Sequence, residues 1–245
     1  MKSNDSLTST YDDETFEAVK KFQTRHGLIS DGVIGKSTKT AFNFTKEERK
    51  HQIIVNLERW RWFSKSFAPN YVLINIPDYS LNVVENQNIT MTKRIVVGKI
   101  KRETPILTSM LQTIVFNPTW TVPPTILRED VIPSISRNRN YLAQTNIKVY
   151  DSNGIEVSAS NWQLSKAKGY RYVQTPGTFN SLGMVKFSFP NRFSVYLHDT
   201  NHRDFFGKQK RSLSSGCVRV QNPLELAEYL LNDEDNWKLE KITEV

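Results

Sequence analysis

The hydrophobic period of this 245-residue chain changes near residue 70. Before that point apolar side chains recur at helical spacing, and from Tyr71 onward they alternate as they do in β-strands. The two patterns predict an α+β chain in which a small helical module precedes a larger, mostly β domain. The hydrophobic content of 38% is sufficient for a folded core.

Three helices are expected in the first part of the chain. A capping carboxylate opens the first, a glycine ends it, and a capping box opens the third. Their expected limits are Asp12 or Asp13 to about His26, Ser37 onward for a short helix, and Thr45 to about Phe63. We therefore assign residues 1–45 to a helical module, 46–68 to a linker helix and 69–245 to the main domain.

Strand-like segments follow, separated by Pro, Asn and Gly turns, at residues 71–76, 81–85, 92–97, 112–116, 184–189 and 193–197. Residues 124–170 interrupt them with a helical pattern near 128–137 and then a polar stretch, which predicts an insertion lying over a functional site. A final helix is expected from Pro223 to Leu231, with Asn222 as its cap.

The only cysteine, Cys217, stands in the segment Ser-Ser-Gly-Cys-Val-Arg-Val, and His198 lies a short distance upstream. A lone thiol cannot form an internal disulfide, and it becomes a nucleophile only with a base to take its proton and positive charge to hold the thiolate. His198 can supply the base and Arg219 part of the charge, while Gly216 leaves room for a substrate carbonyl beside the sulfur. A free cysteine can also be a small buried hydrophobe, so the segment by itself leaves both alternatives open.

Strand parity indicates that these residues lie together. Alternation puts Tyr196 and His198 on one face of their strand, and Cys217 and Arg219 on the face opposite the core in theirs. If the two strands are neighbours, all four side chains share one surface.

The net charge of +8 favours an anionic polymer as partner, such as nucleic acid, a membrane surface or cell wall. The basic residues are scattered, and the sequence has no zinc-finger spacing, arginine-rich tract or glycine-rich phosphate loop, so nucleic acid is not the expected partner. One cysteine and four poorly spaced histidines predict no metal site, and no cofactor is expected. No apolar run reaches the length of a membrane span and the polar N-terminus is not a signal peptide, so we expect an export signal or membrane anchor only in a missing N-terminal segment.

Two segments, His198-Asp199-Thr200 and Ser215-Gly216-Cys217-Val218-Arg219, resemble in this order the signature of the L,D-transpeptidases with a YkuD-type catalytic domain. Asp199 stands where that family usually has glycine, a variant similar to the large periplasmic YcbB-like subgroup. Further segments in matching order are residues 94–99, Thr104-Pro105, 116–123, Pro176-Gly177, Asn180, Leu182-Gly183 and Lys186-Phe187. Residues 18–38 resemble the C-terminal part of a type-one peptidoglycan-binding module.

The resemblance implies an acyl-enzyme mechanism on a mostly β YkuD-type domain. Cys217 would attack the carbonyl between the third residue of a peptidoglycan stem tetrapeptide and its terminal D-Ala, and an amine of a second stem would resolve the thioester. His198 would move the protons, and the backbone N–H groups of Gly216 and Cys217 would hold the oxyanion. Residues 124–170 would form a substrate-capping subdomain. The expected substrate contacts are Trp120, Tyr196, Ser215 and Arg219.

The same resemblance implies a periplasmic or otherwise extracytoplasmic, cell-wall-associated protein, with stem peptides as partners and carbapenems as covalent inhibitors. The acyl acceptor stays open: water would give an L,D-carboxypeptidase, a lipoprotein lysine an anchoring enzyme, and attack on existing cross-links a hydrolase. A cell-wall binding protein with an incidental thiol is the alternative from another functional class. The sequence is equally compatible with a structural Arg219 bonded to loop carbonyls and with Trp120 as a core residue.

Overall fold

The computed structural model describes residues 10–62, 67–233 and 235–244. They fall into two compact units, and the boundary lies between Tyr71 and Val72. The first unit is helical and the second combines sheets with helices, which confirms the expected α+β class.

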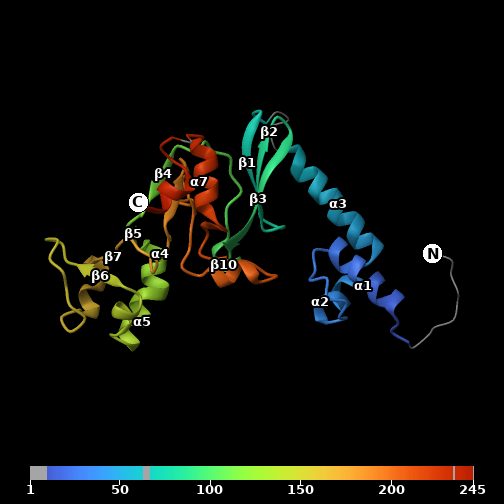
Figure 1. Cartoon of the computed structure of the whole chain (residues 1–245). Coiled ribbons are helices and arrows are strands. Elements are labelled where there is room, and N and C mark those ends of the chain that lie inside the picture. The colour runs from blue at the N-terminus through green and yellow to red at the C-terminus, as the bar shows by residue number, and fades with distance from the viewer. Residues whose placement is uncertain (1–9, 63–66, 234, 245) are drawn as a thin grey trace. The chain divides into compact units, whose positions relative to one another are not determined.

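The first unit contains three helices, α1 Asp13–Arg25, α2 Lys36–Phe42 and α3 Lys46–Arg61 (Figure 1). Asp12 is the N-cap of α1, because its carboxylate accepts a hydrogen bond of 2.9 Å from the backbone N–H of Thr15. The capping box of α3 is confirmed, since Thr45 and Glu48 each bond the backbone of the other. Helix α2 begins one residue earlier than predicted. Phe63, the expected end of the third helix, lies outside the described residues.

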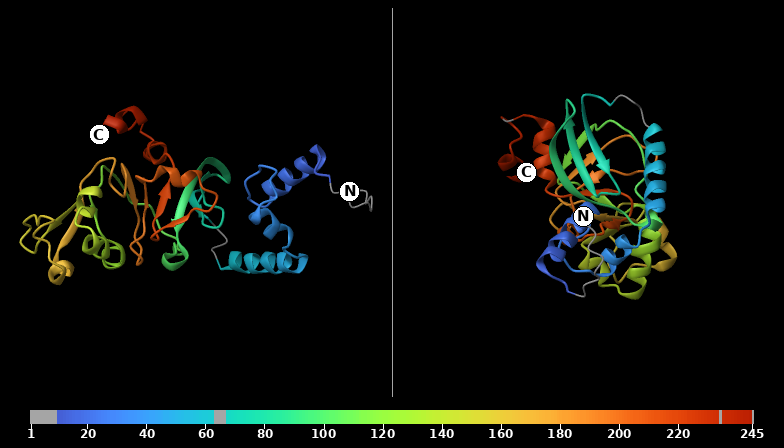
Figure 2. Two further views of the ribbon diagram at one scale, coloured as in Figure 1. Left: turned by 90° about the horizontal axis from the view of Figure 1, so that it is seen from below. Right: turned by 90° about the vertical axis from the view of Figure 1, so that its right-hand side faces the viewer.

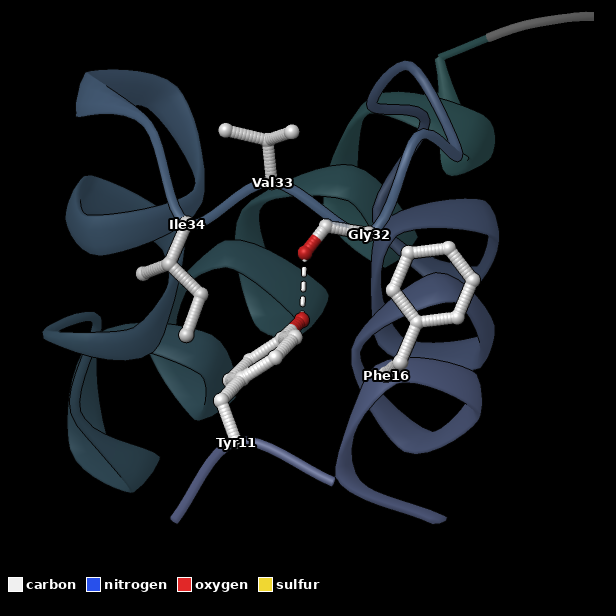
Figure 3. Close-up of a pocket in the computed structure, with 5 residues that line it drawn as sticks. All are labelled: Tyr11, Phe16, Gly32, Val33 and Ile34. Atoms are coloured by element: carbon white, nitrogen blue, oxygen red, sulfur yellow. Dashed lines mark hydrogen bonds between the residues drawn. The ribbon is translucent and has the colours of Figure 1, made fainter. Parts of the chain in front are cut away.

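An apolar hollow lies at the loop between α1 and α2, where Figure 3 shows its five lining residues: Tyr11, Phe16, Gly32, Val33 and Ile34. The hydroxyl of Tyr11 donates to the carbonyl of Gly32. Gly32 has φ +74°, and a Cβ there would meet the ring of Phe16 at 2.1 Å. The loop therefore requires glycine at this position.

The second unit is built on a mixed sheet of eight strands in the part of the chain that is described, in the order β1-β2-β3-β11-β9-β8-β4 with β10 paired to β3. The pairs β9–β11 and β3–β10 are parallel. The strand limits are β1 Asn70–Asn75, β2 Ser80–Glu85, β3 Asn88–Gly98, β4 Thr113–Phe116, β8 Val185–Ser188, β9 Leu197–His198, β10 Ser212–Ser214 and β11 Val218–Val220.

Helix α7, Pro223–Leu231, packs on this sheet (Figure 1). Leu226 and Ala227 of the helix are fully buried in one cluster with Ile95 and Phe187 of the strands. This cluster fixes the strands from their apolar side, so that their other faces can carry polar groups. Outside residues 120–174, the shorter helices of this unit are η1 Ile100–Arg102, η4 Arg203–Gly207 and α8 Leu239–Glu244, while η3 Leu164–Gly169 lies between β6 and β7.

A second sheet, in the order β5-β7-β6, is formed within residues 120–174, which contain the predicted insertion 124–170 and are called the insertion below. Its elements are β5 Trp120–Thr121, α4 Pro124–Ile126, the π-helix η2 Leu127–Val131, α5 Ile132–Arg137, α6 Tyr141–Gln144, β6 Ile147–Tyr150 and β7 Arg171–Gln174. The insertion has its own core, in which Ile135, Trp162 and Tyr172 are almost fully buried. It lies at the end of this unit away from β1 and β2 (Figures 1 and 2).

One local prediction was wrong, and a second was confirmed only in part. The expected strand at residues 193–197 is a turn as far as Val195, because the side chain of Asn191 accepts from the N–H groups of Phe193 and Val195 and Ser194 adopts φ +56°. Asn222 stands at the predicted N-cap of α7, and the helix has the predicted limits, but the Asn222 side chain makes no capping hydrogen bond and its backbone is left-handed, with φ 46° and ψ 56°. At Asn191 and at Asn222 the structure depends on a local side-chain or backbone conformation. The alternation of hydrophobic residues does not indicate such a conformation.

The three strands of the insertion were not predicted, and its helix begins at Pro124 instead of near residue 128. Strands of two to four residues are too short to show a period. Among the described residues, no helix combines the length and the apolar character needed to cross a bilayer.

Candidate active site

The strands that carry the histidine and the cysteine are parallel neighbours. Arg219 of β11 lies opposite His198 of β9, and Val218 lies opposite Leu197. The N–H of Val218 donates to the carbonyl of Tyr196 at 3.1 Å, which places Cys217 beside Tyr196. The expected pairing is confirmed.

The side-chain parity is confirmed as well. Leu197, Val218 and Val220 are buried in the main core, so the neighbouring positions Cys217 and Arg219 face the opposite side of the sheet.

A third strand completes the site. In β8, Lys186 pairs directly with His198. Directly paired residues point to the same face of a sheet, so Arg219, His198 and Lys186 form a row across β11, β9 and β8. The ammonium of Lys186 stands 4.3 Å from the centre of the Tyr196 ring. Sequence reasoning did not select Lys186 as a site residue. The apolar neighbours Val185 and Phe187 are buried, so alternation along the strand places Lys186 on the same face as His198.

His198 is neutral in this environment. It is 5% exposed, and burial, followed by the charge of Arg219, lowers its pKa from 6.5 to about 3; Lys186 acts in the same direction. Backbone groups of Asp199 and Leu182 oppose the shift. Within the described residues, Nδ1 has no hydrogen-bond partner.

The carboxylate of Asp199 does not orient the histidine, as expected from its position in the strand. It accepts hydrogen bonds from the N–H of Met184 at 2.9 Å and from the guanidinium of Arg203 at 3.2 Å. Gly183 is pressed against this carboxylate, since a Cβ on Gly183 would meet Oδ2 at 2.3 Å. Asp199 therefore holds the turn before β8.

Leu182, whose backbone affects His198, is itself fixed by a buried asparagine. The side-chain oxygen of Asn180 accepts from the N–H of Leu182 at 2.8 Å, and its amide donates to the carbonyls of Pro118 and Thr175. With a further bond of 3.4 Å to the carbonyl of Gln174, the side chain of Asn180 makes four hydrogen bonds that hold this turn.

The thiol of Cys217 interacts with Tyr196 more directly than with any other titratable group. Burial raises the pKa of Cys217, whereas the main chain and the hydroxyl of Tyr196, followed by the charges of Lys186 and Arg219, lower it. Burial and the neighbouring Cys217 raise the pKa of Tyr196, whose hydroxyl also interacts with the side chain of Trp120. At neutral pH the resting pair is therefore a neutral thiol and a neutral imidazole.

Residues 214–217, which we call the nucleophile loop, are held by their own hydrogen bonds. The hydroxyl of Ser214 donates to the carbonyl of Cys217 at 2.6 Å and accepts from the N–H of Gly216 at 3.2 Å. Thr104 donates to the carbonyl of Gly216 at 2.8 Å, and Gly216 has φ +116°. Of the two expected oxyanion donors, the N–H of Gly216 is thus engaged, while that of Cys217 makes no hydrogen bond to any described residue.

The remaining predicted residues lie around this loop. Arg219 donates to the hydroxyl of Thr200 at 3.2 Å and stacks on Phe205 at 5.5 Å, and it makes no bond to loop carbonyls among the described residues. Trp120 is 8% exposed in the core of the insertion, and Tyr196 packs against the same cluster. Ser215 accepts a hydrogen bond from Arg102, a residue that sequence reasoning missed because nothing in its local pattern marks it.

Among the described residues, no group of three or more His, Cys, Asp or Glu side chains could hold a metal ion. The row Arg219, His198 and Lys186, with a thiol beside it, is instead suited to proton transfer and to an anionic intermediate.

Comparison with known proteins agrees with this geometry. Residues 69–238 match the family model described as the L,D-transpeptidase catalytic domain, of the YkuD type, and residues 2–42 match a model described as "Putative peptidoglycan binding domain". A "Putative L,D-transpeptidase" from Haemophilus influenzae is 35% identical over 167 residues, which cover 67% of this chain and 34% of that protein. The aligned part is thus about a third of the relative's length. The chain belongs to the L,D-transpeptidase family with a YkuD-type catalytic domain.

Proposed function

We propose that this protein cross-links peptidoglycan stem peptides, third residue to third residue, through a thioester on Cys217 with release of D-Ala. The observation that carries the proposal is the parallel pairing of β9 with β11, which presents His198 and Cys217 on one face of the sheet. Membership of the L,D-transpeptidase family gives the reaction class.

In the first half-reaction, the sulfur of Cys217 attacks the carbonyl carbon of the donor stem's third residue. The thiol proton passes to His198, the C–N bond to D-Ala breaks, and His198 returns the proton to the leaving amine. In the second half-reaction, the side-chain amine of an acceptor stem attacks the thioester carbonyl and gives its proton to His198. The new amide forms and the thiol is restored.

The electrostatics support a general base instead of a preformed ion pair. Burial raises the pKa of Cys217 and lowers that of His198, so a thiolate and an imidazolium do not coexist at rest. His198 is consequently free to accept a proton at neutral pH. Lys186, Arg219 and the hydroxyl of Tyr196 then stabilise the thiolate as it forms.

The tetrahedral oxyanion needs fixed donors beside the sulfur. The N–H of Cys217 is the first candidate, because no described residue occupies it. The N–H of Gly216 would join it only after releasing the hydroxyl of Ser214. We assign substrate contacts to Tyr196, Trp120 and Arg219. Ser215 contacts Arg102 in this structure, so its part in binding substrate is indirect.

A cell-wall location follows from this function, and the two family matches, one catalytic and one peptidoglycan-binding, support it. We propose an extracytoplasmic, periplasmic setting. Carbapenems are expected to acylate Cys217, because their strained carbonyl meets the same thiol and the same donors.

The test is mass spectrometry after incubation with disaccharide-tetrapeptide, using the parent protein and Cys217→Ala. A cross-linked stem dimer with loss of D-Ala, made by the parent alone, is the expected result. D-Ala release with only tripeptide as product would assign the water acceptor and a carboxypeptidase. Turnover by Cys217→Ala would contradict the thioester. A carbapenem adduct on the parent, absent from Cys217→Ala, measures the reactivity of the thiol independently of the stem substrate.

A further inference from the structure

Arg102 joins the insertion to the nucleophile loop. It ends the short helix η1, and its side chain is 11% exposed. The guanidinium contacts Asp130 at 2.5 and 3.1 Å and Glu129 at 2.7 and 3.1 Å, both in the π-helix of the insertion. On the other side it donates to the hydroxyl of Ser215 at 2.9 Å. A guanidinium has five N–H donors, and all five are used here.

The geometry of the Arg102 contacts is that of a specific connection between the insertion and the nucleophile loop, and not of an isolated surface ion pair. Two carboxylates lie on one guanidinium in a forked arrangement, which lysine could not reproduce. The hydrogen bond to Asp130 is the main reason that the pKa of Arg102 is raised, and hydrogen bonds from Arg128 and Arg102 lower the pKa of Glu129. The carboxylates belong to a π-helical turn, a distortion that is frequent at functional sites.

On the side of the nucleophile loop, the residues around Ser215 are also held by hydrogen bonds and close packing. Ser215 precedes Gly216, whose carbonyl accepts from Thr104, and Thr104 in turn accepts from the N–H of Gly98 at 2.9 Å. A Cβ on Gly98 would meet the carbonyl oxygen of Arg102 at 2.2 Å. The segment from Gly98 to Thr104 contacts the nucleophile loop through its backbone, since the N–H of Lys99 donates to the carbonyl of Ser214 at 3.0 Å, and through the side chains of Arg102 and Thr104.

We propose that Arg102 is a positioning residue that fastens the insertion to the nucleophile loop, so that the N–H of Cys217 is held in place only while the insertion is seated. The inference rests on the proposed function for its catalytic consequence and on the contacts alone for its mechanical part. Loss of the connection lowers turnover because the oxyanion donor and the sulfur are no longer fixed relative to Trp120, the insertion residue that we assign to substrate binding.

The mechanical part is tested by amide hydrogen exchange of the full chain, followed by mass spectrometry of peptides covering residues 126–137 and 213–218. In Arg102→Met, exchange should accelerate by about tenfold or more in both peptides, because a network of charge-assisted hydrogen bonds is removed. Asp130→Asn, which keeps the volume and leaves Arg102 present, should give a smaller change in both. Circular dichroism identifies any variant that has lost its fold. If Arg102→Met does not fold, the exchange rates of Asp130→Asn and Arg102→Lys are compared with those of the parent instead.

Two control variants separate this connection from general loosening. Arg128→Met removes an exposed partner of the same Glu129 and should change neither peptide by more than about twofold. Arg139→Met removes bonds to the carbonyls of Ala159 and Trp162 inside the insertion, and it should affect residues 126–137 without residues 213–218. Unchanged exchange of residues 213–218 in Arg102→Met, or the same increase in Arg128→Met, overturns the proposal.

The catalytic part is tested by steady-state kinetics with disaccharide-tetrapeptide. Arg102→Met and the double variant Arg102→Met/Asp130→Asn should each lose about 10- to 100-fold in kcat, and the double variant should lose no more than Arg102→Met alone. Multiplicative losses would show that the two residues act separately and would contradict the connection. If the exchange results are as expected while the parent makes no cross-link, the connection stands and the proposed function fails.

Discussion

Tyr196 and Cys217 lie beside each other where β9 and β11 begin, because the N–H of Val218 donates to the carbonyl of Tyr196, and the hydroxyl of Tyr196 lowers the pKa of the thiol. The same hydroxyl interacts with Trp120 in the core of the insertion. The tyrosine thus connects the sulfur with the insertion through side chains, in addition to the connection that Arg102 makes with the loop.

The first prediction concerns the reactivity of the thiol with pH. The rate of alkylation of Cys217 by iodoacetamide should continue to rise above pH 9, because burial raises the thiol pKa above its ordinary value of 9.0 and only the thiolate reacts. Tyr196→Phe removes a donor that favours the thiolate, so the profile should move about one pH unit higher. Mass spectrometry of the only cysteine measures both, and Tyr229→Phe, whose hydroxyl bonds Thr90, is the control. A profile that levels off below pH 8 would contradict the structure.

The second prediction concerns the general base. His198→Gln should lower kcat for cross-linking by about 10²- to 10⁴-fold, because it removes the group that we assign as the base for the Cys217 thiol. Carbapenem acylation should slow in parallel when followed by mass spectrometry. Lys186→Met is a useful comparison, because it removes charge from the same row and leaves the base; its loss should be smaller. Equal losses in the two variants would mean that charge, and not proton transfer, limits the rate.

The third prediction concerns stability in acid. His198 has a pKa of about 3 in the fold against 6.5 when unperturbed. Between these values the unfolded chain binds a proton that the folded chain does not, so the free energy of unfolding rises with pH across this window, by up to about 1.4 kcal/mol per pH unit. Urea unfolding at pH 4.5 and 7 should therefore show a weaker pH dependence in His198→Gln than in the parent. An identical dependence in both proteins would show that His198 is protonated in the fold.

The fourth prediction concerns the turn before β8. Gly183→Ala should destabilise the second unit by roughly 1–3 kcal/mol, because φ is +61° and the added methyl would collide with the carboxylate of Asp199. Gly169→Ala is the matched control, since a Cβ there meets nothing within 4 Å. Thermal unfolding monitored by near-ultraviolet circular dichroism compares the two variants. Similar midpoints in both would indicate that the turn can shift away from Asp199.

The long periodic elements could be predicted from sequence because their signals are local. The capping box at Thr45 and Glu48, the helix after Asp12 and the strands around residues 71–116 follow from residue spacing alone. The turn after Asn191 and the left-handed backbone of Asn222 could not be predicted, because each contains a residue with positive φ, which most residues other than glycine rarely adopt. The short strands of the insertion exist only because they pair with one another.

The sequence by itself determined the α+β class, the nucleophile and base candidates, and the family resemblance, since these depend on residue types at fixed spacing. Only the tertiary structure decided that Lys186 lies opposite His198, that the thiol contacts Tyr196, and that Arg102 joins the insertion to Ser215. These residues are far apart in the chain, and strand order and burial bring them together. The pKa values depend on that arrangement, because desolvation and neighbouring charge arise from packing and not from composition.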